Sequence, residues 1–350
     1  MKKYKNLYQE LCSEENLDLA FKKAQKRKSR KPYVIEFNNN LNENLKILRD
    51  ELLSERYKPR PLRTFVIRDP KVRKIRKSYF VDRIVHHAIC NVLEPIFEKR
   101  FIHDSFANRI GKGTLNAIKR FDKFKLKVSK NNTRNCYVFK ADVKHYFDEV
   151  NHSILIDILR KKINDERLIS LISKVLKNHS DKIGMPLGNM TSQFFANCYL
   201  NELDQFVKNE LKAKYYIRYV DDFIILHNDK NILENYKEKI NIFLKEKLQI
   251  ELHPTKSKVL LLNKGIAFLG YRNYPYHRLL RKSNIRTMKK RIDIEDYDPI
   301  CEFLEGWFSY ANHANTYNLR HKVTENIEDS FPGRISKLHM DRMIKKEAIA

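Results

Sequence analysis

The chain has 350 residues, a formal charge of +27, 42% hydrophobic residues and 11% aromatic residues. This composition excludes a wholly disordered chain, and no apolar run is long enough to span a bilayer. Such a charge destabilises a compact protein by self-repulsion, so we expect a polyanionic partner. Nucleic acid is the first candidate, and a membrane surface is the alternative. The first five residues have no apolar signal core, so we expect a cytoplasmic protein without membrane attachment.

The N-terminal part of the chain, residues 1–60, is predicted to be basic and helical. Leu41, Leu45, Leu48 and Leu52 are spaced as the buried face of one helix. The elements expected next are strands at 65–67 and 74–75 around a turn at Asp69-Pro70, a helix at 81–97 and a mobile basic loop at 123–135.

The pattern changes at Tyr137, where strand-forming residues lead to Asp142. The apolar segment 215–226 carries Asp221 and Asp222 at its centre, which predicts a hairpin with both aspartates at or near its tip. Around these strands we expect helices at 153–162, 166–177, 188–211 and 231–248, strands at 259–262 and 266–271, and helices from 283 onward. Strands and helices interleave without regular βαβ alternation, so the predicted fold class is α+β.

Adjacent aspartates in an apolar hairpin put two like charges against a hydrophobic sheet, which costs free energy unless a cation is present. For an isolated pair, a solvated turn is the alternative. Here Asp142 ends another predicted strand of the same core, so three hard oxygen ligands are available, as Mg²⁺ prefers. Two such ions stabilise both oxygens of an in-line phosphoryl displacement. The three aspartates therefore predict attack of a primer 3′-hydroxyl on the α-phosphate of a nucleotide.

Several segments resemble, in the same order, the motifs of reverse transcriptases. Tyr-Val-Asp-Asp at 219–222 matches their YxDD box, and residues 139–148 resemble their first catalytic motif. The other matching segments are the middle box at 184–193, a primer-gripping hairpin at 268–271, and finger motifs of group II intron-like enzymes at 82–88, 93–98 and 105–109. The resemblance implies a right-hand polymerase. Its parts would be a basic helical extension (1–60), fingers (61–136), a palm of antiparallel sheet and helices with inserted finger elements (137–275), and a helical thumb with a C-terminal tail (276–350).

The resemblance also implies roles for single residues. Asp142, Asp221, Asp222 and the backbone carbonyl of Val143 would hold two Mg²⁺ ions, for which Mn²⁺ could substitute. Lys256 corresponds to the lysine proposed to protonate leaving pyrophosphate, with simple phosphate binding as the alternative. Further nucleotide contacts are expected at Lys71, Arg73, Arg109, Val143, Phe147, Leu187, Gly188 and Gln193, and a primer grip at Phe268, Leu269, Gly270 and Tyr271. Phe147 would exclude the ribose 2′-hydroxyl.

The middle box departs from the group II intron pattern, which has Pro-Gln-Gly followed by Ser-Pro. This chain has Pro186-Leu187-Gly188 and ends the box with Ser192-Gln193. That combination resembles reverse transcriptases of diversity-generating retroelements, which copy a template RNA with frequent errors opposite adenine. A glutamine could hydrogen-bond the incoming nucleotide and Leu187 cannot, so we expect looser substrate selection. Packing of Leu187 in the core is the alternative.

The resemblance implies a template RNA, an RNA or DNA primer and deoxynucleotides as partners. It also implies a small basic accessory protein, commonly pentameric in that family. Three alternatives stay open at this point. They are an antiphage-defence or retron reverse transcriptase, a non-catalytic RNA-binding protein, and an RNA-dependent RNA polymerase, which usually has a smaller or polar residue at the position of Phe147.

Overall fold

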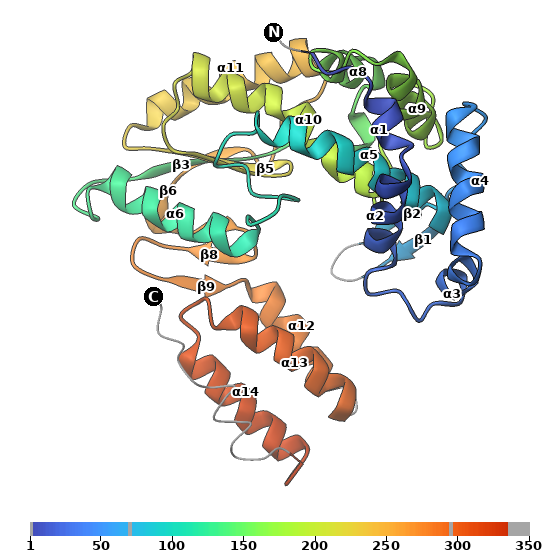
Figure 1. Ribbon diagram of the computed structural model, residues 1–350. Coiled ribbons are helices and arrows are strands. Elements are labelled where there is room, and N and C mark those ends of the chain that lie inside the picture. Colours follow the sequence, from blue (N-terminus) through green and yellow to red (C-terminus); the bar gives the residue numbers. More distant parts are fainter. Residues whose placement is uncertain (1–2, 69–71, 294–296, 335–350) are drawn as a thin grey trace. The chain divides into compact units, whose positions relative to one another are not determined.

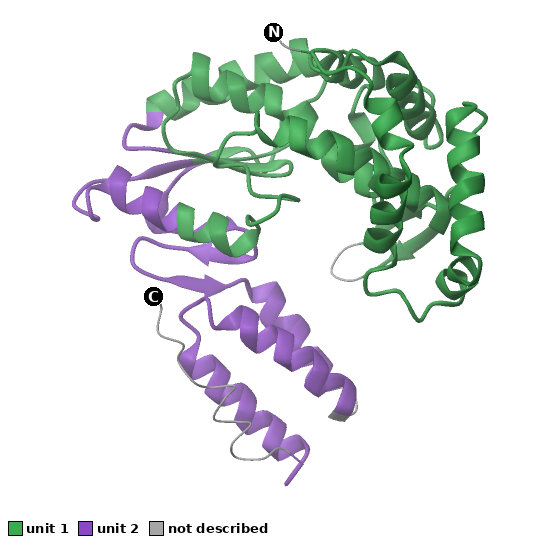
Figure 2. Cartoon of the chain, in the orientation of Figure 1, with its two compact units in different colours: residues 1–120, 139–225, 231–258 green, residues 121–138, 226–230, 259–350 purple. Residues whose placement is uncertain are grey.

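The computed structural model describes residues 3–68, 72–293 and 297–334. The chain forms two compact units (Figure 2), of which the first comprises residues 1–120, 139–225 and 231–258. The second comprises residues 121–138, 226–230 and 259–350. The division into extension, fingers, palm and thumb stays a prediction. Among the described helices, none is both long enough and apolar enough to cross a membrane.

The first unit begins with helices, as predicted for residues 1–60. The Ser13 side chain accepts a hydrogen bond from the backbone N–H of Asn16 and so caps the second helix. The Tyr8 hydroxyl donates to the Leu52 carbonyl at 2.6 Å and ties the first helix to the fourth. These helices are α1 (Leu7–Leu11), α2 (Glu14–Gln25), α3 (Pro32–Asn39) and α4 (Leu41–Leu53).

A two-stranded ribbon precedes the long helix α5 (Figure 1). The strands β1 (Arg63–Ile67) and β2 (Arg73–Lys77) pair antiparallel, as predicted, and every residue of β1 is exposed. The turn expected at Asp69-Pro70 lies outside the described residues. In contrast to the ribbon, α5 (Phe80–Glu98) packs against α2 and α10 and buries the apolar face that its sequence predicts.

A four-stranded sheet with the order β4-β5-β3-β6 carries the predicted aspartates. Its strands are β3 (Tyr137–Asp142), β4 (Tyr216–Tyr219), β5 (Asp222–His227) and β6 (Lys258–Leu261). Tyr219 pairs with Asp222 across the antiparallel β4–β5 hairpin, so Val220 and Asp221 form its two-residue turn. The predicted hairpin is therefore confirmed. The helices in this part are α7 (Tyr146–Glu149), α8 (His152–Arg160), α9 (Glu166–Lys177), α10 (Met190–Gln205), the π-helical η1 (Phe206–Glu210) and α11 (Lys230–Leu248).

The loop predicted at 123–135 is wrong, because most of it belongs to the helix α6 (Thr114–Ser129). Ala117, Phe121, Phe124 and Val128 recur every three or four residues, and all four are buried. This spacing defines the apolar stripe of an amphipathic helix. The lysines between these residues made the segment look like a solvated loop.

The single strand predicted at 266–271 is wrong, because the chain reverses at Leu269-Gly270 and forms the hairpin that the resemblance implies there. A further strand, which the sequence did not indicate, completes the three-stranded order β7-β8-β9. The predicted C-terminal helices are present. The elements of this region are the 3₁₀ turn η2 (Leu262–Lys264), β7 (Ile266–Phe268), β8 (Tyr271–Asn273), β9 (Arg278–Leu280), α12 (Lys282–Ile292), α13 (Tyr297–Ala311) and α14 (Tyr317–Ser330).

Candidate active site

Asp142 and Asp221 come together where their strands end. Asp142 is the last residue of β3, and Asp221 is the second residue of the β4–β5 turn. The backbone N–H of Val143 donates to the Asp221 carbonyl at 3.3 Å and joins the two segments. Burial, and then the negative charge of Asp142, raises the pKa of Asp221 to about 6. A buried carboxyl whose ionisation is disfavoured by a neighbouring carboxylate forms a site that favours a bound cation.

The segment after α11 fixes Asp142 from the other side. The Asp142 carbonyl accepts a hydrogen bond from the backbone N–H of His253 at 2.7 Å, and the Ser257 hydroxyl donates to the same carbonyl at 3.3 Å. Lys256 Nζ lies 2.5 Å from Asp142 Oδ2. The structure therefore brings Lys256 to the predicted carboxylates, where its positive charge also acts to lower the pKa of Asp221.

Asp222 is the first residue of β5, and Lys140 Nζ lies 3.9 Å from its Oδ1 atom. Over the described residues, no three His, Cys, Asp or Glu side chains form a group that could hold a metal ion. Of the three predicted carboxylates, Asp142 and Asp221 converge, while Asp222 lies beside Lys140. A metal centre of all three carboxylates stays a prediction.

The middle box packs against the β1–β2 ribbon. The Leu187 carbonyl accepts a hydrogen bond from the backbone N–H of Arg76 at 3.0 Å. Gly188 has φ +117, and a Cβ there would lie 2.9 Å from Ile75 Cγ2, so the close approach requires glycine. The Leu187 side chain is half-buried rather than part of the core. This exposure counts against core packing as its role.

Two more predicted nucleotide contacts lie at this site. Phe147 is half-buried, and its carbonyl accepts a hydrogen bond from the backbone N–H of Met185 in the middle box at 2.6 Å. Arg73 is exposed on β2, and its charge opposes the rise in the pKa of Asp221, which places the guanidinium within electrostatic reach of that carboxyl. Lys71 lies outside the described residues.

The Arg109 side chain makes its contacts within the protein, and its contact with a nucleotide stays a prediction. Its side chain is 6% exposed and forms an ion pair with Glu98 at 2.6 Å. Its Nη1 atom also donates to the carbonyls of Ile102 and Ser105, both at 2.7 Å. These bonds use the guanidinium to hold the loop between α5 and α6. Gln193 is exposed and lines a separate cavity of about 760 Å³ among residues of α2, α5 and α10.

The predicted primer grip divides into two parts. Phe268 and Tyr271 are buried, and the Tyr271 hydroxyl donates to the Tyr310 carbonyl at 2.9 Å. The Tyr310 hydroxyl in turn donates to the Gly270 carbonyl at 2.7 Å. The side chains of Phe268 and Tyr271 therefore anchor the hairpin rather than touch a primer. Only the half-exposed Leu269-Gly270 turn is accessible to one.

Sequence reasoning missed Arg218, which is fully buried on β4. Its guanidinium donates to both carboxylate oxygens of Asp204 on α10, at 2.7 and 2.6 Å. Its Nη1 atom also donates to the Val220 carbonyl at 3.1 Å. Val220 has φ +56, which is strained for a β-branched residue. The ion pair thus holds the turn that carries Asp221, and an arginine within an apolar strand was the signal for it.

A buried polar network supports the middle box from α5. Asn189 Oδ1 accepts hydrogen bonds from the backbone N–H and the hydroxyl of Ser78, at 3.3 and 2.9 Å. The Ser78 hydroxyl lies 3.1 Å from His86 Nε2, and Thr191 Oγ1 lies 2.6 Å from His86 Nδ1. Burial, and then the charges of His87 and Arg83, lowers the pKa of His86 to about 3. His86 is therefore neutral at pH 7.

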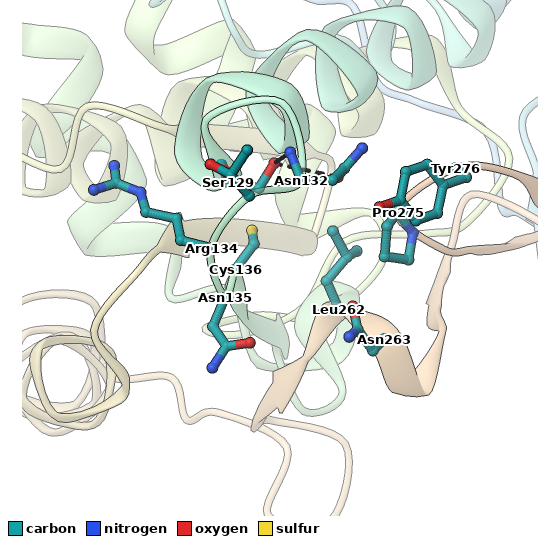
Figure 3. A pocket seen from close by; sticks show the side chains of 10 residues that line it. Ser129, Asn132, Arg134, Asn135, Cys136, Leu262, Asn263, Pro275 and Tyr276 are labelled. Carbon is teal, nitrogen blue, oxygen red and sulfur yellow. Dashed lines mark hydrogen bonds between the residues drawn. The ribbon is translucent and has the colours of Figure 1, made fainter.

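The second unit contains a small polar cavity of about 160 Å³ (Figure 3). Asn132 donates its backbone N–H to the Ser129 hydroxyl at 2.9 Å at the end of α6. None of the predicted site residues lines this cavity. Its wall includes Ser129, Asn132, Asn135, Cys136, Asn263 and Tyr276.

Comparisons with known proteins agree with this architecture. A family profile described as reverse transcriptase (RNA-dependent DNA polymerase) matches residues 67–273. Protein YkfC of Escherichia coli (strain K12) is 31% identical over 281 residues, which cover 68% of this chain and 71% of YkfC. The group II intron-encoded protein LtrA of Lactococcus lactis subsp. cremoris is 26% identical over 302 residues, which cover 65% of this chain and 49% of LtrA.

The solved structure of apo telomerase from Candida tropicalis has a similar fold, with a TM-score of 0.53 and 13% sequence identity. The match covers 82% of this chain and 58% of the telomerase chain. The chain belongs to the reverse transcriptase (RNA-dependent DNA polymerase) family. It is by this membership an RNA-directed DNA polymerase, and it spans about half the length of LtrA.

Proposed function

We propose that the chain copies a template RNA into DNA by adding deoxynucleotides to a primer 3′-hydroxyl at Asp142, Asp221 and Asp222. The observation that carries this proposal is the convergence of Asp142 and Asp221 at two strand ends, where burial and mutual repulsion raise the pKa of Asp221 to about 6. Holding two carboxylates this close costs free energy that a bound cation would recover. Such a site suits nucleotidyl transfer.

The donor chemistry fits Mg²⁺, with Mn²⁺ as a substitute, because every candidate ligand is a hard oxygen. The ligands would be the carboxylates of Asp142, Asp221 and Asp222 and the backbone carbonyl of Val143. Two bound ions would increase the acidity of the primer hydroxyl and stabilise the charge on the leaving pyrophosphate.

The surrounding side chains have separate tasks in this proposal. The Lys256 ammonium, next to Asp142, donates a proton to the leaving pyrophosphate and is left as the neutral amine. Arg73, whose charge reaches Asp221, binds the triphosphate from the ribbon. Phe147 is half-exposed beside the middle box and closes the space that a ribose 2′-hydroxyl needs. A site closed in this way by Phe147 selects deoxynucleotides over ribonucleotides, which argues against an RNA-dependent RNA polymerase.

We further propose that synthesis is error-prone at template adenines, as in diversity-generating retroelements. Leu187 supports this subtype, because its half-buried side chain offers no hydrogen bond where related enzymes have glutamine. Its backbone is held by Arg76, so Leu187→Gln would present an amide from the same position. Selection that lacks a directional contact discriminates less between right and wrong substrates.

Primer extension on an RNA template, with Mg²⁺, four deoxynucleotides and sequencing of the product, tests both levels of the proposal. We expect DNA from the wild type and none from Asp221→Asn. Errors concentrated opposite adenine, and fewer errors with Leu187→Gln, would support the retroelement subtype. Accurate synthesis would favour a defence or retron enzyme. No synthesis, even with the cognate RNA and accessory protein, would leave a non-catalytic RNA-binding protein.

The proposal includes the partners and location of the protein. We place it in the cytoplasm with its template RNA, a primer and a small basic accessory protein. The charge of +27 should make binding of RNA weaken steeply as salt rises. Co-purification of a small basic protein with the tagged chain would support the accessory partner. Recovery of an active enzyme without such a protein would show that the accessory protein is not required.

A further inference from the structure

A basic cavity of about 410 Å³ lies where α3, the start of β1, the end of β2 and the start of α5 meet. Its wall includes four cationic side chains and four aromatic rings, but only one carboxylate, that of Glu36. This volume is within the range of sites for small organic groups. The excess of positive charge indicates an anionic ligand, and the rings indicate that the ligand also has a flat, apolar part.

Arg83 is the central cation of this cavity. Its Nε atom donates to the Ser78 carbonyl at 3.0 Å, and its guanidinium carbon lies 5.3 Å from the centroid of the Tyr33 ring. Among the residues described, its Nη1 atom is buried and has no hydrogen-bond partner. A buried charged donor without an acceptor is costly, and a phosphate oxygen would supply the acceptor.

The rings around Arg83 are arranged for stacking. The guanidinium of Arg63 lies 4.3 Å from the Tyr79 ring centroid, and Lys77 Nζ lies 5.6 Å from the Tyr33 ring centroid. Burial alone would raise the pKa of Tyr33, but Arg83, with the charges of Lys77 and Lys28, outweighs burial and lowers it. Cations interleaved with aromatic faces are typical of sites that bind unpaired bases and their phosphates.

We propose that this cavity binds one nucleotide of single-stranded RNA, with a phosphate on Arg83 and the base against Tyr33 and Tyr79. The inference rests on the proposed function, which supplies the RNA. A duplex keeps its bases paired and stacked, so it cannot place one in the cavity. Ser78 accepts from Arg83 and donates to Asn189 at 2.9 Å, so the cavity is joined directly to the middle box.

The test measures binding of a fluorescent oligouridine RNA, and of a duplex RNA of equal length, to the full chain by anisotropy. We expect Arg83→Gln and Tyr33→Leu each to weaken single-strand binding about tenfold, as loss of one phosphate contact or one stacked base does. Duplex binding should be unchanged. The matched control is Lys46→Gln, which removes one exposed charge from α4 outside the cavity and should change neither affinity.

The dependence of RNA affinity on salt concentration distinguishes the phosphate contact from the base contact. Arg83→Gln should reduce the slope of log affinity against log salt by about 1, whereas Tyr33→Leu should leave the slope unchanged. Equal losses on single-stranded and duplex RNA, or losses no larger than that of Lys46→Gln, would overturn the proposal. If Arg83→Gln does not fold, photocrosslinking of 5-bromouridine RNA to the wild type tests the proposal instead. A crosslinked peptide that contains Tyr33 or Tyr79 would support binding of RNA in the cavity, and crosslinks only to other peptides would refute it.

The same measurements distinguish this inference from the proposed function. Asp221→Asn should bind single-stranded RNA as the wild type does. If the wild type makes no DNA but its RNA binding depends on Arg83 and Tyr33, the polymerase proposal fails and the cavity stands. If DNA is made and both variants bind RNA normally, the cavity alone is refuted.

Discussion

The β4–β5 and β7–β8 hairpins both turn over two residues, but they reach that geometry by different means. In the β7–β8 turn, Leu269 and Gly270 have φ values of +48 and +89, and glycine supplies the second position as type I′ turns prefer. In the β4–β5 turn only Val220 has a positive φ, at a position that favours glycine. The residues of the turn therefore specify the β7–β8 hairpin. The β4–β5 hairpin has a turn residue that disfavours the observed backbone conformation, and the buried ion pair of Arg218 holds this turn in place.

The largest expected effect comes from removing that ion pair. Arg218→Met leaves the Asp204 charge buried without its cation, so we expect the free energy of unfolding to fall by about 3–5 kcal/mol. Urea denaturation followed by circular dichroism measures the change. An unchanged midpoint would show that the pair does not hold the turn.

The double variant Arg218→Met with Asp204→Leu separates stability from positioning. An apolar replacement of both partners should restore stability to within about 1 kcal/mol of the wild type. The Val220 carbonyl still lacks its donor, so we expect kcat to stay at least about tenfold low. Recovery of kcat together with stability would refute the positioning role.

Gly270→Ala tests the other hairpin. The new Cβ would clash with the Tyr310 hydroxyl, at a φ that alanine rarely adopts, so we expect a loss of about 2 kcal/mol in the free energy of unfolding. Gly306→Ala is the matched control, because a Cβ there has no atom within 4 Å. That control, inside α13, should gain about 0.5–1 kcal/mol. A neutral Gly270→Ala would mean that the turn is not locally specified.

Acid should weaken the two regions unequally. The pKa of His86 is lowered to about 3, so the unfolded chain binds this proton near pH 6.5 while the folded chain does not. The contribution of His86 to stability is therefore complete above pH 6.5 and falls by about 2 kcal/mol at pH 5. Hydrogen exchange at pH 7 and pH 5 should show the loss in α5 and α10, and less of it in β7–β9. His86→Gln should reduce the pH dependence by this amount and leave the part that comes from His87, whose pKa burial lowers to about 4. An unchanged dependence would exclude His86 as a contributor.

The smallest effect, and one of opposite sign to Gly270→Ala, is expected for Val220→Gly. Glycine adopts φ +56 without strain, so we expect a gain of about 1 kcal/mol in stability. A turn freed from strain holds Asp221 less rigidly, so kcat should fall while stability rises. Thermal unfolding and primer extension on the same preparation measure both quantities. A loss of stability would show that Val220 is not strained.

Periodicity and motifs predicted those parts of the fold that depend on neighbouring residues. The strand 137–142, the helix α9 and the β4–β5 hairpin lie where the sequence placed them. Where two local signals conflicted, the prediction was wrong. In α6 the lysines suggested a loop, while Phe121 and Phe124 carried the helical stripe.

The partners of the arginines could not be predicted, because they depend on long-range contacts. Arg109 was predicted to contact a nucleotide, and its pairing with Glu98 was not foreseen. Arg218 was assigned no role, and it supports the turn that carries Asp221. The residue type gives the charge of a side chain, but it does not show which group lies next to that side chain in the folded chain. The same limit applies to Asp222. The motif predicts that Asp222 binds a metal ion, but it does not show that Lys140 lies next to Asp222.

The fully exposed strand β1 gives the ribbon an independence that the rest of the first unit lacks. A two-stranded ribbon is marginally stable by itself, and exposed elements open with free energies near zero. Opening β1 would leave the core around α5 intact. The exposed middle of β1 can therefore change at little cost in stability, whereas β2 is tied to the site through Arg73, whose charge reaches Asp221, and Arg76, which bonds Leu187.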